Sequence, residues 1–134
     1  MKPVLNGVRG ITLISVFAIH SFLQDSRFDF SSPTNIGPTV NTSHFDGGPS
    51  ISPDGLNLYF TSDRGGGSGG GDLWVTKRAK PADTFGVPEN LGPSLNSPAN
   101  EFAPSISADG LSIYFDSDRP GGLAAMARLV TQKI

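Results

Sequence analysis

The chain of 134 residues repeats itself with a period of 55 residues. Gly37-Pro38 recurs as Gly92-Pro93, and the two copies align without a gap. A repeat of this kind predicts two copies of one structural unit. The other matched positions are Phe30 and Phe85, Pro33 and Pro88, Asn35 and Asn90, Asn41 and Asn96, Asp46 and Glu101, Pro49–Ser52 and Pro104–Ser107, Asp54–Leu56 and Asp109–Leu111, Tyr59-Phe60 and Tyr114-Phe115, Ser62–Arg64 and Ser117–Arg119, and Gly66-Gly67 and Gly121-Gly122.

Each unit predicts short strands joined by a defined turn. In Leu56–Thr61, Leu, Leu and Phe alternate with Asn, Tyr and Thr, the period-2 pattern of a strand with one buried face. Pro53-Asp54-Gly55 precedes it and has turn chemistry, so Pro49–Ser52 is expected to be the first arm of an antiparallel hairpin. Asp72–Arg78 is expected as a third strand, with Leu73 and Trp74 facing different layers. Asp83–Leu91 is expected as a fourth, outer strand.

Four short antiparallel strands per repeat, with the repeats in tandem, are typical of a β-propeller blade. The 17 Gly, the 11 Pro and a charged fraction of only 16% favour short strands and turns over long helices. We therefore expect an all-β fold with two antiparallel four-stranded blades of an incomplete propeller. A β-sandwich and a short β-solenoid are the alternatives. A closed propeller needs at least about four blades, so two blades leave open edges that invite pairing with another chain.

The repeat resembles a known family. Pro49–Gly55 and Leu58–Arg64 are similar to the TolB-type, WD40-like propeller repeat, as are Gly65–Gly71 and the Asp72-Leu73-Trp74 that follows. The resemblance covers residues 30–119 most clearly. It implies a protein-binding platform of the cell envelope, or a gating domain attached to a peptidase.

The second copy departs from the pattern near its end. Ala124–Ala127 (AAMA) stand where the first copy has Gly69–Asp72 (GGGD). Leu123–Val130 is rich in good helix formers, which favours the start of a short helix there. We expect repeat 1 over residues 28–84 and repeat 2 over residues 85–134, with a degraded or shifted end to the second.

The first 27 residues look different from the repeats. Lys2 and Arg9 precede the apolar run Ile11–Leu23, which is about as long as the core of a signal peptide and shorter than the roughly 20 residues of a membrane span. Residues 1–27 are expected to be a signal peptide or a weak membrane anchor, which predicts a periplasmic or secreted protein. A stray N-terminal strand and a start codon placed too far upstream are the alternatives.

Composition and motifs argue against several kinds of chemistry. The chain has no cysteine, a net charge of −2 and no basic stripe, so disulfides, thiolate metal sites and nucleic-acid binding are not expected. Gly66–Gly70 fits G-x-S-x-G, but the only histidines, His20 and His44, lie upstream of it. We therefore expect no enzyme activity, no cofactor and no metal.

Two pairs of charged residues recur in the repeat and are candidate binding residues. Asp46 and Glu101 precede the first arm of each hairpin, and Arg64 and Arg119 follow the second arm. The alternative is structural: each arginine pairs with a neighbouring carboxylate or carbonyl and holds successive blades in register.

These observations predict a non-enzymatic propeller repeat protein, a fragment, that acts as a protein-binding scaffold for an unidentified protein partner. Self-association that completes the propeller is part of this prediction. One alternative is a detached propeller domain of a peptidase or other hydrolase. Others are an independent propeller enzyme, such as a glycosidase or lactonase, and a gene fragment without function.

Overall fold

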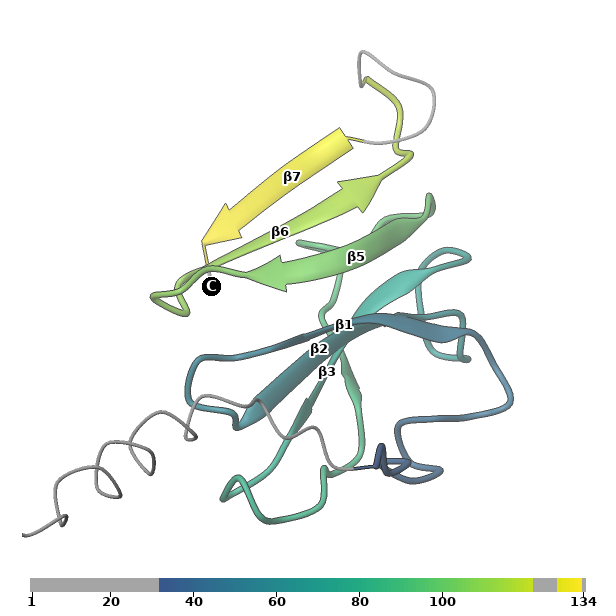
Figure 1. Ribbon diagram of the computed structural model, residues 1–134. Helices are drawn as coiled ribbons and strands as arrows, with labels where there is room; N and C mark the ends of the chain where they lie inside the picture. Colours follow the sequence, from purple (N-terminus) through teal and green to yellow (C-terminus); the bar gives the residue numbers. More distant parts are fainter. Residues whose placement is uncertain (1–31, 122–127, 134) are drawn as a thin grey trace, which may run out of the picture. The chain divides into compact units, whose positions relative to one another are not determined.

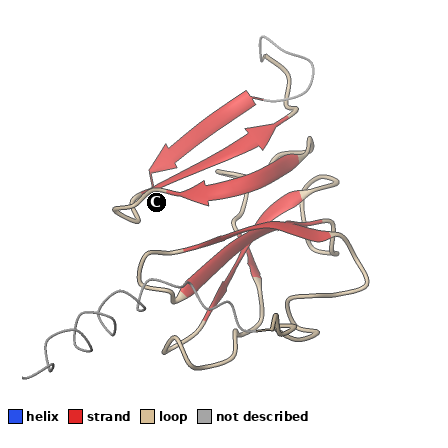
Figure 2. Ribbon diagram, in the orientation of Figure 1, coloured by secondary structure: helices blue, strands red, loops and turns tan. Residues whose placement is uncertain are grey.

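The computed structural model describes residues 32–121 and the backbone of residues 128–133 (Figure 1). The expected signal or anchor segment, residues 1–27, lies outside the described residues. The described residues form strands and loops only, as Figure 2 shows, so the expected all-β fold is confirmed for them. Within these ranges no helix is long and apolar enough to cross a membrane.

The first sheet has four antiparallel strands. They are β1 (Asp46–Ile51), β2 (Asn57–Ser62), β3 (Asp72–Lys77) and β4 (Glu89–Asn90), in the spatial order β1-β2-β3-β4. The predicted hairpin and third strand are confirmed. The predicted fourth strand is present but short, since only two residues of the expected Asp83–Leu91 pair with β3.

The second sheet has three antiparallel strands in the described part of the chain, where four were expected. They are β5 (Glu101–Ile106), β6 (Ser112–Ser117) and β7 (Arg128–Lys133), in the order β5-β6-β7. The expected start of a helix is wrong at residues 128–130, because they pair with β6 as part of β7. Residues 123–127 lie outside the described residues.

The two sheets share their register up to the last strand. Asp46 pairs with Ser62 in the first sheet, and the equivalent Glu101 pairs with Ser117 in the second. Ser62 then pairs with Asp72, but Ser117 pairs with Arg128, one residue later than a gapless repeat requires. The gapless alignment therefore does not extend to β7, because the second repeat has one residue more than the first between these two strands. That the end of the second repeat is degraded stays a prediction.

The turn before β2 follows the prediction. Asp54 Oδ1 accepts hydrogen bonds from Ser52 Oγ (2.5 Å) and from the backbone N–H of Leu56 (3.0 Å). Gly55 has a φ of 74°, in the left-handed region that favours glycine. The equivalent turn before β6 has the same bonds around Asp109. Both hairpins are therefore set by local chemistry.

The hydrophobic core consists of two clusters on opposite faces of the first sheet. Leu73 and Trp74 point to different faces, as expected: Trp74 belongs to one cluster and Leu73 to the other. The prediction of a single buried face holds for β6 but is wrong for β2, where Tyr59 packs against the cluster between the sheets. The second sheet covers this face of the first. The cluster on the outer face contains Val40, Leu58, Phe60 and Trp74, and the cluster between the sheets contains Leu73, Leu95, Ile113 and Phe115.

Candidate functional site

The structure brings the four predicted charged residues together as two equivalent ion pairs. Arg64 Nη2 lies 2.5 Å from Asp46 Oδ1, and Arg119 Nη2 lies 2.9 Å from Glu101 Oε1. Each arginine also donates from Nε to the serine two positions before it, over 2.9 Å. The side chains of Asp46 and Glu101 are only 8% and 0% exposed.

Each ion pair also holds the loop that precedes its sheet. Arg64 donates to the carbonyl oxygen of Val40 (2.7 Å), and Arg119 donates to that of Leu95 (2.6 Å). Each arginine pairs with a neighbouring carboxylate or carbonyl, as expected, and in fact with both. The expectation that these pairs hold successive blades in register is wrong, because each joins a loop to its own sheet. That these residues bind a partner stays a prediction.

Asp46 is ionised over a wide pH range. Burial by itself raises the pKa of this carboxyl, but hydrogen bonds from Thr42, Arg64 and Ser62 outweigh burial and lower the pKa to about 2. The backbone N–H of Thr42 donates to Oδ2 over 2.6 Å, and Ser62 Oγ donates to Oδ1 over 2.7 Å. The negative charge of Asp46 is thus compensated within the repeat by Arg64 and by hydrogen-bond donors.

An open apolar pocket lies beside Asp46. Its volume is about 110 Å³, and most of its lining surface is apolar. We call it the first-repeat pocket. Its lining residues are Ile36, Val40, Asn41, Asp46, Gly47, Pro49, Leu58 and Phe60.

The equivalent place in the second repeat is filled by a strand of the first sheet. Leu95, Ile113 and Phe115 are the counterparts of Val40, Leu58 and Phe60, and they form one buried cluster with Leu73 of β3. Leu73 is completely buried there. In the second repeat, an aliphatic side chain from an extended strand thus occupies the place that corresponds to the first-repeat pocket.

An asparagine holds the backbone of the inserted strand. Asn96 Oδ1 accepts from the N–H of Leu73 (2.8 Å), and Asn96 Nδ2 donates to the carbonyl oxygen of Leu73 (3.0 Å). Its counterpart Asn41 lines the first-repeat pocket and is exposed. Within the described ranges, Asn41 Nδ2 donates only to Asn35 Oδ1 (3.0 Å), the equivalent of the bond from Asn96 to Asn90.

Among the residues that the structure describes, no strand covers the first repeat in this way, and exposure reflects the difference. Asn96 is 2% exposed, whereas Asn41 is an exposed residue. Ile36 and Ile51 are 44% and 51% exposed, although their counterparts pack against the cluster around Leu73. Positions that are covered in repeat 2 are therefore open to solvent in repeat 1. The counterparts are Leu91 for Ile36 and Ile106 for Ile51.

The glycine run before β3 is held by a carboxylate. The backbone N–H groups of Ser68 and Gly69 donate to the carboxylate of Asp72 over 3.0 to 3.2 Å, and Asp72 is buried. The G-x-S-x-G match at Gly66–Gly70 thus lies in a loop that leads into a strand, without the strand-turn-helix context of a nucleophile elbow.

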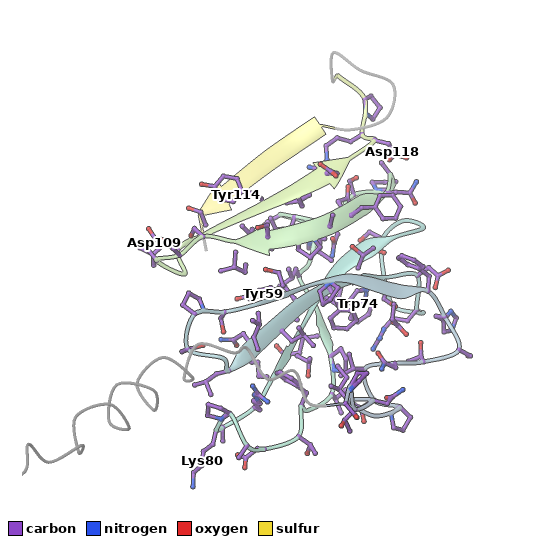
Figure 3. The ribbon with its side chains drawn as sticks, viewed as in Figure 1. Tyr59, Trp74, Lys80, Asp109, Tyr114 and Asp118 are labelled. Carbon is purple, nitrogen blue, oxygen red and sulfur yellow. The ribbon has the colours of Figure 1, made fainter. Side chains whose placement is uncertain are left out.

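A second, polar hollow lies between the two hairpin turns. Asp54 and Asp109 both line it, together with Tyr59. Asp109 and Tyr59 are labelled in Figure 3. The pKa of each carboxyl is lowered, first by the hydrogen bond from the serine of its own turn and then by a backbone N–H. Within residues 32–121 and 128–133, no three His, Cys, Asp or Glu side chains converge as a metal site.

Sequence reasoning missed the residues that distinguish the two repeats. The recurrence of Asn41 as Asn96 was the available signal, but its role depends on Leu73, which is 23 residues from Asn96. Neither a scan against models of known protein families nor a search of curated proteins found a match for this chain.

Proposed function

We propose that this chain is a non-enzymatic β-propeller repeat protein that binds another protein at the first-repeat pocket and works in the cell envelope or outside the cell. One observation carries the proposal. The equivalent place in the second repeat holds a protein strand, with Leu73 in the apolar hollow and Asn96 on its backbone.

The chemistry of the pocket favours a polypeptide over a small molecule. An asparagine amide presents one acceptor and one donor side by side, which matches the N–H and C=O of one residue in an extended chain. The apolar hollow beside it selects an aliphatic side chain. Extended peptides are commonly bound in this way: hydrogen bonds to the peptide backbone provide affinity, and a pocket for a side chain provides specificity.

The architecture supports the same proposal. Each sheet begins with the same hairpin in the same register, and the sheets stack through the cluster around Leu73, as tandem blades do. The carboxylates of Asp46 and Glu101 are each neutralised by an arginine, so they favour a structural over a catalytic role.

A peptide experiment tests the proposal. The probe is a fluorescent peptide with the sequence of residues 70–78 (GGDLWVTKR), which contains Leu73. We expect it to bind the full chain with saturable anisotropy, and a peptide with aspartate in place of this leucine to bind at least about tenfold more weakly.

The pocket is identified by a pair of protein variants. Ile36→Glu changes a lining residue that is 44% exposed, so the fold should tolerate it. Val87→Glu adds the same charge at a residue that is 80% exposed and does not line the pocket. Ile36→Glu should abolish binding and Val87→Glu should leave it unchanged. Equal binding by both peptides, or by both variants, would refute the proposal.

A further inference from the structure

We infer that the first-repeat pocket binds strand β7 from a second copy of this chain, so that copies join head to tail. This inference rests on the proposed function and names the partner. The two sheets of the chain have equivalent faces. The face that the first sheet turns toward the second corresponds to the face of the second sheet that carries the exposed Tyr114.

Tyr114 lies on the face of the second sheet that would pack against the first-repeat pocket of another copy. Its counterpart Tyr59 lies on the face of the first sheet turned to the second, where it packs against the cluster around Leu73 (Figure 3). Tyr114 is 37% exposed. In the described part of the chain, repeat 1 therefore has an open pocket, and repeat 2 exposes Tyr114 on the equivalent of the surface that fills such a pocket.

The backbone of β7 supplies the matching strand position. Leu129 pairs with Asp116 as Leu73 pairs with Thr61, and Asp116 is the counterpart of Thr61. The one-residue shift before β7 thus places a leucine, rather than the Arg128 of a gapless repeat, at the position of Leu73. The pairing of β5 with β6 has the same register as the pairing of β1 with β2, so the backbone groups of Asp116 point in the same directions as those of Thr61. The N–H and C=O of Leu129, opposite Asp116, therefore face away from β6, as those of Leu73 face away from β2. Asn41 of a second copy can pair with them as Asn96 pairs with Leu73.

The two surfaces are different, so the contact is heterologous. Such contacts close into a ring when the rotation between copies allows it. Closed propellers have about four to eight blades, so about two to four copies of a two-sheet chain complete one. Exposed apolar side chains beside the pocket become buried in this assembly. Ile36, which lines the pocket, is one of them.

The test is the solution mass of the full chain, from size-exclusion chromatography with light scattering over about a hundredfold range of concentration. We expect a discrete oligomer of about two to four copies. Ile36→Glu blocks the pocket and Tyr114→Glu blocks the opposite surface; both side chains are partly exposed, so each variant should fold as a monomer. Val87→Glu is the control and should keep the oligomer.

Mixing the two blocked variants gives the decisive result. The Ile36→Glu chain keeps a working β7 surface and the Tyr114→Glu chain keeps a working pocket, so an equimolar mixture should form a one-to-one dimer. A dimer that Ile36→Glu breaks but Tyr114→Glu does not would show pocket-to-pocket pairing and overturn the inference.

The failures of the two proposals are distinguishable. A wild-type chain that is monomeric throughout but binds the peptide of residues 70–78 overturns the second-copy inference and leaves the proposed function standing, with a different protein as partner. Oligomerisation that appears only after residues 1–27 are removed also overturns it for the full chain, because the chain's own N-terminal segment then occupies the pocket. A monomer that does not bind the peptide refutes both.

Discussion

The hydrogen bonds between Asn96 and Leu73 give the sharpest test of how the two sheets are joined. Asn96→Ala removes the acceptor of the Leu73 N–H, which is completely buried. The carbonyl oxygen of Leu73 keeps one partner, the N–H of Leu91 at 3.0 Å. The substitution therefore leaves one buried donor unsatisfied and breaks the bonds from Asn96 Nδ2 to Leu73 and Asn90.

The expected cost follows from these contacts. An unsatisfied buried donor costs about 1–3 kcal/mol, and each further hydrogen bond contributes a net 0.5–1.5 kcal/mol or so. We expect Asn96→Ala to lower the free energy of unfolding by about 3 kcal/mol. The matched control is Asn41→Ala, which changes an exposed residue bonded to Asn35 and should cost about 0.5 kcal/mol or less.

Asn96→Asp adds a dependence on pH. Burial and the facing oxygens of Leu73 and Asn90 raise the pKa of the introduced carboxyl, because they disfavour its charged form. Only the protonated carboxyl can donate as the amide does. This variant should therefore lose stability near neutral pH and recover part of it as the pH falls toward about 4, relative to Asn96→Ala.

The assay is urea unfolding at a concentration where the chain is monomeric, followed by fluorescence of Trp74, the sole tryptophan, and by circular dichroism. Coincident curves from the two probes justify a two-state free energy. Equal costs for Asn96→Ala and Asn41→Ala would refute the reasoning, as would a deficit of Asn96→Asp that does not change with pH.

Four other substitutions have defined outcomes in the same assay. Ala103 has a φ of 49° at the irregularity in β5, so Ala103→Gly should stabilise the folded chain by about 1 kcal/mol. Gly48→Ala should destabilise the folded chain by about 2 kcal/mol or more, because Gly48 has a φ of 61° and the added Cβ would lie 3.1 Å from the Cα of Ala103. The Asp46 carboxyl, with its pKa lowered to about 2, should contribute about 2 kcal/mol to the free energy of unfolding. This contribution is present above about pH 4 and is lost as the pH falls through about 2. A wild-type chain that loses no more stability over this range than Asp46→Asn would contradict the prediction. Trp74→Phe should cost about 2 kcal/mol, measured by circular dichroism, because the buried indole N–H donates to the Ser62 carbonyl oxygen over 3.2 Å; a cost near zero would place the indole outside the core.

The parts of the fold that sequence could predict are those fixed by neighbouring residues. Asp54 accepts hydrogen bonds from groups within two positions of itself, and Gly55 has the positive φ. The turn and the hairpin could therefore be predicted from the sequence. The pairing of Arg64 with a carboxylate was predicted in kind. Its specific partner, Asp46, lies 18 residues away.

The rest depends on which surfaces meet, and periodicity does not encode that. The pattern of β2 and β6 is the same, yet Tyr59 is packed between sheets while Tyr114 is partly exposed. The departure AAMA indicated a degraded or shifted end to the second repeat, but only the strand pairing gives the shift before β7 as one residue, because loops change length without disturbing the hydrophobic pattern of the strands. The pocket was missed for the same reason: repeat 1 and repeat 2 have equivalent residues there and differ only in what covers them.

The position of β4 has a consequence for folding during synthesis. This strand closes the first sheet, but Glu89 and Asn90 belong by sequence to the second repeat. A nascent chain that has emerged only as far as residue 84 lacks the outermost strand of a sheet whose other three strands are complete. The first sheet is therefore completed only by a strand from the second repeat, and a truncation at the sequence boundary should expose the edge of β3 to aggregation.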